Sequence, residues 1–174
     1  GFSTLLTLSD GNKIDNPREL RKGELRLAQA HRSRNYRLVA KLQERQANRR
    51  KDRNHKISRM LVENYKSIYY SNDNFKGLAR SHGKSVSEAG LGQLIGMINY
   101  KGRTGGRDVI PVNSKFTTMT CSSCGAISGP KGWTGLKVRT WECSECGSVH
   151  DRDVNAAMVI LKSGAGIALE SKAV

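Results

Sequence analysis

The N-terminal residues have a pattern of apolar and polar positions typical of a β-strand. In STLLTLSDGNKI, residues 3–14, apolar side chains lie on both sides of an Asp10-Gly11 pair, which suits a tight turn. Two later segments rich in β-branched and aromatic residues, SIYYSNDNF (67–75) and RDVIPVN (107–113), are expected to be strands as well. The pattern therefore predicts an N-terminal hairpin and two further strands.

Other segments carry apolar residues at helical spacing. From Pro17 to Met60 the chain has no further proline and is rich in helix-forming residues, so it predicts two long helices separated by a break at NRRKDRNH (48–55). The apolar positions that define these helices are Leu20, Leu27, Leu38, Leu42, Ile57, Met60, Leu61 and Tyr65.

Two more helices are predicted in the second half of the chain. SVSEAGLGQLIGMINYKG (85–102) is expected to form one helix capped by Ser85 or Ser87, and VNAAMVILKSG (154–164) a last helix that ends at Gly164. Strands and helices thus follow one another along the chain, which predicts the α/β class.

The charge of the chain is concentrated in the predicted basic helices. Its 174 residues contain 30 Lys and Arg against 15 Asp and Glu, a net charge of +15. Residues 18–60 alone hold fifteen basic and four acidic residues, a net +11. Basic residues commonly form nothing more than a solvated helix face, but a solvated face would also contain acidic residues interleaved with the basic ones. We therefore expect phosphate contacts here, from Arg49, Arg50, Lys51 and Arg53.

Length and hydropathy limit the remaining classes of protein. The length suits one domain, or a small domain with an inserted module. The sequence has no run of 18 apolar residues and no signal-peptide pattern, so no membrane partner is expected and the cytoplasm is the expected location. The chain starts at Gly1 with residues already patterned as a strand, and we expect it to be a piece of a longer protein.

Four cysteines form two pairs with the spacing of a metal site. Cys121 and Cys124 are separated by eighteen residues from Cys143 and Cys146, and this spacing is typical of a four-thiolate zinc site. Such a site has no open coordination position, so its metal would be structural. Two disulfides or four free thiols are the alternatives, and His150 is close enough to compete as a ligand.

The residues between the two cysteine pairs allow two interpretations. Trp133 and Trp141 are expected to pack against the cysteine pairs, because a small ribbon has little other core. The neighbouring Lys137 and Arg139 are candidates for contact with nucleic acid.

Two aspartates follow the cysteine module in the sequence HDRDVNAA. Asp153 stands directly before a predicted helix, where an aspartate commonly caps the exposed backbone amides. A carboxylate at the start of a helix is also a suitable ligand for Mg²⁺. The residues alone leave both roles open.

The cysteine module and these aspartates resemble a known family. TMTCSSCG, WECSECG and HDRDVNAAMVIL are similar to the C-terminal signature of the transposon-encoded TnpB (OrfB) family, which is related to the type V CRISPR effectors. GFSTLLTLSDG, NPRELRKGELRLA and INYKGRTGGRDVIPVNSKFTTMTCSSCG also resemble the family, so the similarity runs over nearly the whole chain.

The resemblance implies a fold and a division into domains. Family members are RNA-guided DNA endonucleases with a RuvC-like, RNase H-type mixed sheet into which a zinc ribbon is inserted. By this resemblance, residues 1–120 are the first part of the RuvC-like domain, including a basic helical segment at 17–66. Residues 121–149 are the zinc ribbon, and residues 150–174 are the last RuvC-like motif and helix.

The resemblance also implies catalytic residues, partners and cofactors. Asp153 matches the family's last catalytic aspartate. The first catalytic aspartate would lie two residues before Gly1, outside the chain, and the middle glutamate falls on Ser71. Asp73, two residues further on, is on the same strand face and could substitute. Guide RNA, target DNA, structural Zn²⁺ and catalytic Mg²⁺ are the implied partners and cofactors.

Because carboxylates are missing, the chain itself is expected to cleave nothing. The alternatives are a nuclease-inactive protein that binds DNA through a guide RNA or through the zinc ribbon, and a transposon remnant without activity.

Overall fold

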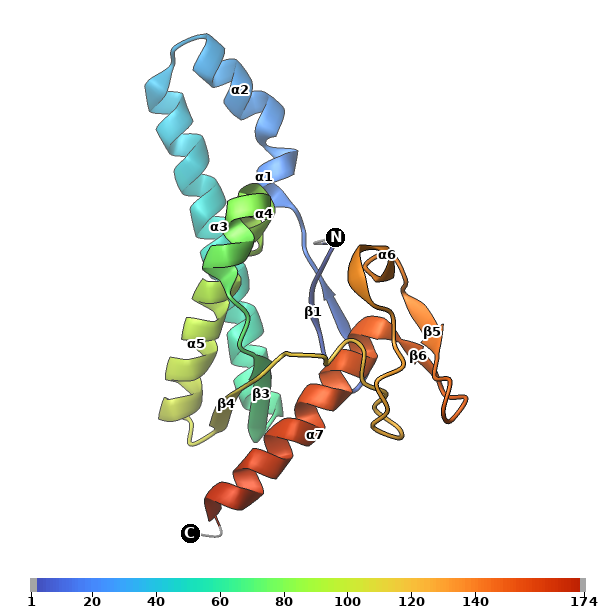
Figure 1. Cartoon of the computed structure of the whole chain (residues 1–174). Coiled ribbons are helices and arrows are strands. Elements are labelled where there is room, and N and C mark those ends of the chain that lie inside the picture. The colour runs from blue at the N-terminus through green and yellow to red at the C-terminus, as the bar shows by residue number, and fades with distance from the viewer. Residues whose placement is uncertain (1–2, 173–174) are drawn as a thin grey trace. The chain divides into compact units, whose positions relative to one another are not determined.

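The computed structural model describes residues 3–172 of the chain, and the side chains of all of these except Trp133 and residues 167–172 (Figure 1). The described residues form two compact units. One contains residues 3, 15–68 and 74–109, and the other contains residues 4–14, 69–73 and 110–172. Each unit is described by itself.

The elements alternate between strands and helices, which confirms the mixed α/β class. They are, in order, β1 (Thr4–Thr7), β2 (Lys13–Asp15), α1 (Glu19–Lys22), α2 (Glu24–Arg32), α3 (Tyr36–Asn64), β3 (Ser67–Ser71), α4 (Phe75–Ala89), α5 (Leu91–Thr104), β4 (Asp108–Val112), α6 (Gly132–Gly135), β5 (Thr140–Glu142), β6 (Val149–Asp151) and α7 (Arg152–Lys172).

Among the described residues, the strands pair into three small sheets of two strands each. The pairs are β1 with β2, β3 with β4, and β5 with β6. The predicted strands at 3–14, 67–75 and 107–113 are therefore confirmed as β1, β2, β3 and β4. At the hairpin tip, Asp10 accepts a hydrogen bond from the backbone amide of Asn12 at 2.9 Å, and Gly11 takes a φ of 91°.

The first unit is a helical assembly built around α3 and α5. These helices pack along each other, and α1 and α2 pack on α3 (Figure 1). Apolar residues of α3 and α5, including Leu61 and Leu94, are buried between them. The interface is also unusually polar, because Asn54 and Ser58 are fully buried in it.

The predicted break in the basic helices at 48–55 is wrong. Those residues lie inside α3, a single helix of 29 residues. The chain turns at Ser33 to Asn35 instead, where Arg34 has a φ of 54° and the Asn35 side chain caps α3 by accepting from the amide of Leu38 at 3.0 Å. Inside α3, charged residues pair one turn apart, as Asp52 and Lys56 do at 2.7 Å, so a dense run of charge does not interrupt the helix.

The helix predicted at 85–102 is in fact parts of two helices. Gly90 ends α4 and precedes α5, and its φ of 62° is a left-handed conformation that glycine adopts without steric cost. The cap predicted at Ser85 or Ser87 is accordingly wrong, since both residues lie within α4.

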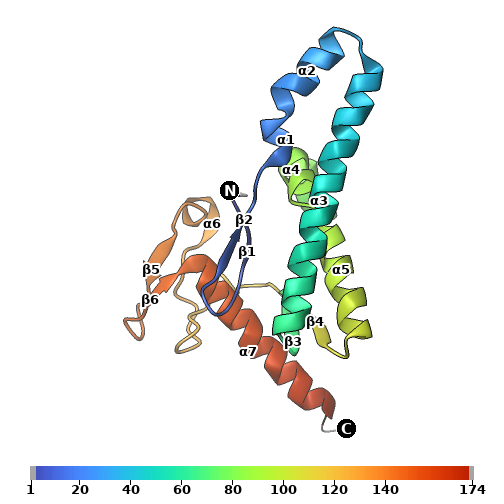
Figure 2. The same ribbon diagram turned by 180° about the vertical axis from the view of Figure 1, so that it is seen from behind.

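The second unit contains the cysteine module and α7. Helix α7 packs against β1 and follows β6 directly, as Figure 2 shows from behind. The helix does not end at Gly164 as predicted but continues to Lys172. A side chain at Gly164 would collide with the ring of Tyr69, so this glycine allows the close packing of the helix on β3 rather than ending the helix.

None of the helices within residues 3–172 has the length and hydropathy required to cross a bilayer.

Candidate metal centre and carboxylate site

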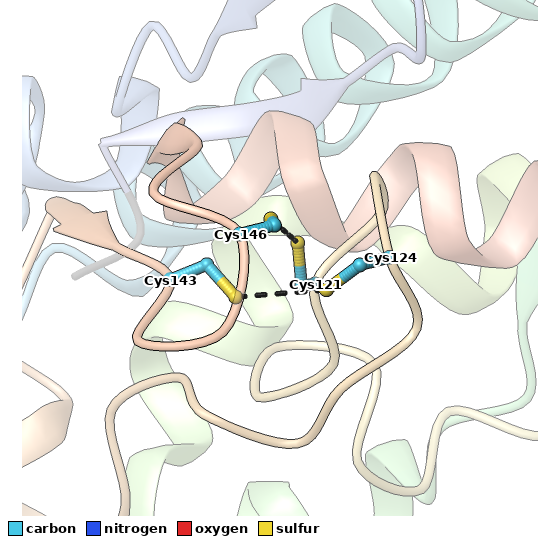
Figure 3. Close-up of side chains that lie close together, drawn as sticks. All are labelled: Cys121, Cys124, Cys143 and Cys146. Carbon is cyan, nitrogen blue, oxygen red and sulfur yellow. Dashed lines mark hydrogen bonds between the residues drawn. The ribbon is translucent and has the colours of Figure 1, made fainter.

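The four cysteine sulfurs converge on one point (Figure 3). Cys121 Sγ lies 3.7 Å from Cys146 Sγ, and Cys124 Sγ lies 3.7 Å from Cys143 Sγ. A tetrahedral ion with metal–sulfur bonds of about 2.3 Å places its sulfurs about 3.8 Å apart. The donor set therefore fits a tetrahedral four-thiolate metal site, and the four thiols are free rather than joined in disulfides.

Each cysteine pair forms a tight turn that points its sulfurs inward. The amide of Gly125 donates to the carbonyl of Cys121, and the amide of Gly147 donates to that of Cys143, both at 2.9 Å. Both glycines have left-handed φ values, 82° and 68°, which explains why glycine follows each pair. The two turns are thus equivalent halves of one site.

Neighbouring groups act on the charge of the thiols. The Ser128 hydroxyl donates to Cys143 Sγ at 3.1 Å and lowers the pKa of this thiol to about 6. The backbone amide of Ala126 lowers the pKa of Cys124, but the three other sulfurs raise it, with the net result of a pKa near 12. Negative charge on four close sulfurs is unfavourable unless a cation is present. A bound metal ion supplies that positive charge.

His150 and Trp141 cover the buried side of the cysteine cluster. His150 Nε2 lies 3.1 Å from Cys121 Sγ, within hydrogen-bond distance of the sulfur, and the imidazole packs on Trp141 with ring centroids 4.9 Å apart. His150 is therefore a neighbour of a cysteine rather than a member of the four-residue group. Trp141 packs against Cys121 and Cys143, as predicted, whereas the Trp133 side chain lies outside the described residues.

The first residues of α7 assign the capping role to Asp151 and not to Asp153. Asp151 Oδ1 accepts from the backbone amides of Asp153 at 3.1 Å and Val154 at 3.0 Å. Its Oδ2 pairs with Lys13 Nζ at 2.6 Å. Burial alone would raise the pKa of Asp151, but the Lys13 ammonium and the two amides outweigh it and hold the pKa below its usual value. Of the two roles that the sequence left open for Asp153, the capping role therefore belongs to Asp151 instead.

Asp153 lies in the first turn of α7 with its carboxylate still available. Its nearest charged partner is Arg139, whose guanidinium is 3.6 Å away, and its side chain is 39% exposed. This exposure decides that the carboxylate is accessible to a metal ion, because a buried ion pair would not be.

Asp73 lies directly beside Ser71 at the end of β3. The hydroxyl of Ser71 donates to Asp73 Oδ2 and that of Ser114 to Asp73 Oδ1, each at 2.8 Å. The two side chains therefore lie close together, although Asp73 stands two residues beyond the end of β3 and is not part of the strand. Among the described residues, the only group of three or more potential metal-ligating side chains is the cysteine cluster, so no gathered set of three carboxylates accompanies Asp153 or Asp73.

Some of the basic residues predicted to bind nucleic acid bond to other groups of the protein, whereas others are only exposed. Arg49 pairs with Glu19 at 2.7 Å, and Arg50 donates to the carbonyl of Ser87 at 3.1 Å. Arg53 donates to the carbonyl of Ala89 at 2.6 Å, and burial lowers the pKa of its guanidinium. Lys51 and Lys137 are exposed, and Arg139 contacts Asp153. Binding by these six residues stays a prediction.

The sequence prediction missed two residues that hold the site together. Lys13 pairs with the capping aspartate, and Asn155 is 1% exposed and bonds to the backbone on both sides of Cys121. Asn155 follows Asp153 by two residues, and its polar side chain in the otherwise apolar stretch 154–161 was a signal that could have found it.

Comparisons with known proteins agree with this arrangement. The family model described as Cas12f1-like, TNB domain, matches residues 92–160. A Streptomyces pristinaespiralis protein, named as a candidate RNA-guided DNA endonuclease, is 34% identical over 179 residues, which cover 94% of this chain and 44% of that protein. A TnpB-like protein of Acanthamoeba polyphaga mimivirus is 31% identical over 167 residues, covering 91% and 31% of the two chains.

A solved structure shares the fold. The cryo-EM structure of a Cas12f1–sgRNA–target DNA complex contains a chain that matches with a TM-score of 0.63 at 17% identity, over 86% of this chain and 43% of that one. This chain therefore spans less than half the length of the proteins described here.

The fold and site together define a class: α/β proteins in which a four-cysteine module leads directly into the last helix. Within that class, the chain belongs to the TnpB family, which is related to the type V CRISPR effectors.

Proposed function

We propose that this chain is the RuvC-like nuclease and zinc-ribbon portion of a TnpB-like, RNA-guided DNA endonuclease. Its partners are then a guide RNA and a target DNA. The proposal draws on its homology to a candidate RNA-guided DNA endonuclease and on its net charge of +15, which suits polyanionic partners.

One observation carries the proposal: the division of roles between the two aspartates after the cysteine module. Asp151 satisfies the helix amides and pairs with Lys13, so the start of α7 needs no further carboxylate for its stability. Asp153 is nevertheless an acidic group one residue inside the helix, partly exposed and beside a single arginine. An accessible carboxylate at this position is suited to coordinate Mg²⁺ through its oxygens.

Two different metals have two different roles in this proposal. Zn²⁺ is held by Cys121, Cys124, Cys143 and Cys146, and it is structural because four thiolates leave no position for water. Asp153 is a ligand for Mg²⁺, which in phosphodiester cleavage activates the attacking water and stabilises the leaving oxygen when bound. Asp153 contributes one negative charge to this site, and Asp73 is the candidate for a second.

The chain itself is proposed to be inactive, because too few carboxylates meet. Cleavage by two metal ions requires several carboxylates around ions about 3.5–4 Å apart. Ser71 stands at the position where the family resemblance implies a glutamate, and its hydroxyl donates a hydrogen bond to Asp73. One serine and one exposed aspartate supply less negative charge than a glutamate and aspartate pair would.

A nuclease-inactive protein that binds DNA with a guide RNA, or through its zinc ribbon, is the second candidate. It is favoured by the same serine and by the ion pair between Arg139 and Asp153, which gives the carboxylate a protein partner without any metal.

The test is cleavage of a target plasmid by the full-length protein with its guide RNA and Mg²⁺. With Ser71 in place we expect little or no cutting, and Ser71→Glu should produce a gain that Asp153→Asn removes. Robust cutting with Ser71 would refute the inactive site. If Asp73→Ala then abolished cutting while guided binding survived, Asp73 would be the missing ligand.

A further inference from the structure

Helix α7 forms hydrogen bonds to the backbone on both sides of Cys121, a candidate metal ligand in the first cysteine pair. Asn155 Oδ1 accepts from the amide of Ser122 at 2.8 Å, and Asn155 Nδ2 donates to the carbonyl of Thr120 at 2.7 Å. Thr120 and Ser122 are the two neighbours of Cys121 in the chain. One buried amide side chain therefore holds the segment that carries Cys121.

Two further residues of α7 also contact this segment. Lys162 donates from its Nζ to the carbonyl of Ser122, and Ser122 Oγ contacts Met158 Sδ at 3.8 Å. Asn155, Met158 and Lys162 are spaced three and four residues apart, so they lie along one face of the helix. That face is directed at the first cysteine pair.

These bonds depend on the shape of the turn that begins at Cys121. Within the turn, the amides of Ser123 and Cys124 bond to the Cys121 sulfur, whereas the amide of Ser122 bonds to Asn155. Ser122 is 5% exposed, so an amide that lost Asn155 would be buried without a hydrogen-bond partner, which is unfavourable. A turn that opened when its metal left would break the same bonds.

We propose that Asn155 is a positioning residue that couples metal binding at the cysteine cluster to the placement of Asp153 on α7. Asn155 stands two residues after Asp153 in the same helical turn. Coupling between two sites is reciprocal in binding free energy, so a bound metal stabilises the start of the helix and the folded helix start raises the affinity for the metal. Taking Asp153 as a Mg²⁺ ligand rests on the proposed function, whereas the coupling itself does not.

The first measurement is the rate at which the zinc-loaded chain releases zinc to an excess of a chromogenic chelator. Asn155→Ala should release zinc about 10–100 times faster, the range by which removal of a partner behind a metal ligand weakens metal sites. Asn48→Ala is the matched control, since Asn48 is an exposed asparagine of α3 in the other unit, and it should release zinc at the rate of the unchanged chain. Equal rates for the two variants would overturn the proposal.

The second measurement is hydrogen exchange at the start of α7 with and without zinc. In the unchanged chain, removing zinc should increase exchange at residues 152–157 while the amides of α5, in the other unit, keep their protection. In Asn155→Ala this dependence on zinc should become much smaller, a signature that a general loss of stability does not give. If residues 152–157 kept full protection without zinc, the coupling would be absent.

A third variant keeps the test decisive if Asn155→Ala fails to fold. Lys162→Met removes one exposed donor and keeps the length of the side chain, so the fold should tolerate it, with Lys131→Met as the exposed control. Zinc release should then be faster by a few-fold, as expected for one hydrogen bond. An unchanged rate in Lys162→Met would count against the coupling. None of these measurements uses cleavage, so a chain that couples zinc to α7 but cuts nothing would separate this inference from the proposed function.

Discussion

The cysteine module and helix α3 both concentrate one kind of side chain, yet their side chains are used in different ways. In the module, four thiols meet within 4.8 Å of one another. In α3, neighbouring cationic residues diverge: Lys51 is exposed, whereas Arg53 turns inward and bonds to the carbonyl of Ala89. Residues of one type gather for one purpose in the first region and serve several purposes in the second.

The difference follows from what each group can bond. Two cysteine pairs whose four free thiols lie this close together are suited above all to bind a metal ion. A guanidinium has five donors that suit a carbonyl, a carboxylate or a phosphate equally well. The last carbonyls of α4 need partners, and Arg50 and Arg53 supply them at Ser87 and Ala89. Charge density alone therefore overstates how much of α3 is free for nucleic acid.

The largest expected effect would come from removing one thiolate. The unchanged chain should contain close to one zinc per molecule, and Cys143→Ser should contain almost none, because the binding energy of a structural zinc is the folding energy of its module. Elemental analysis of the purified chains measures this. Ser144→Ala, which changes an exposed neighbour, should keep its zinc. A metal-free unchanged chain, or disulfides found by mass spectrometry, would remove the contrast between the two regions.

Exchanging two neighbouring cations of α3 should separate their roles. Arg53→Gln should lower the free energy of unfolding by about 1–3 kcal/mol, because the carbonyls at the end of α4 would lose a charged donor. Lys51→Gln should change the free energy by less than about 0.5 kcal/mol, as surface substitutions do. Chemical denaturation measures both. Similar stabilities would show that Arg53 is not a structural residue.

Exposed lysines, in contrast, should affect the binding of nucleic acid rather than stability. Lys51→Gln, and independently Lys137→Gln in the ribbon, should each reduce the slope of log affinity against log salt concentration by about one, since each removes one phosphate contact. Binding to single-stranded RNA and DNA at several salt concentrations gives this slope. If Lys51→Gln left the slope unchanged, the exposed side of α3 would be solvated surface and no binding face.

The sequence predicted the strands and the cysteine site well because their signals are local. The apolar residues around Asp10-Gly11 indicated β1, β-branched and aromatic residues indicated β3 and β4, and the cysteine spacing indicated the four-sulfur cluster. The helix ends were less predictable, because a short turn can be specified by one residue. Asn35 caps α3 and Gly90 separates α4 from α5, whereas the conspicuous charged run at 48–55 is continuous helix.

The roles of residues around α7 depended on tertiary contacts that no local pattern contains. Gly164 resembles a helix end in the sequence, but its missing side chain makes room for Tyr69, which is 95 residues away. From the sequence, only Asp153 was considered as a cap, whereas the hydrogen bonds and the ion pair with Lys13 assign that role to Asp151. Residues brought together from distant segments are therefore the part that the sequence left open.

The smallest expected effect concerns the ion pair between Asp151 and Lys13. Because the pKa of Asp151 is lowered in the folded chain, the pair stabilises the fold above the unfolded value of 3.8 and this contribution disappears as the pH falls through the folded value. Asp151→Asn keeps a capping oxygen but loses the charge, so it should cost about 0.5–1 kcal/mol at pH 7 and less at pH 3. Urea denaturation at both pH values tests this, and an equal cost at both would exclude the charge as its cause.

The most direct test of the proposed carboxylate site is the binding of Mn²⁺, a spectroscopic substitute for Mg²⁺, to the purified zinc-loaded chain. We predict weak binding to the unchanged chain, binding at least about tenfold tighter after Ser71→Glu, and loss of that gain when Asp153→Asn is added, because each carboxylate adds a ligand. Electron paramagnetic resonance titration measures free and bound Mn²⁺. Two tightly bound ions in the unchanged chain, or a gain in Ser71→Glu that survives Asp153→Asn, would contradict the account.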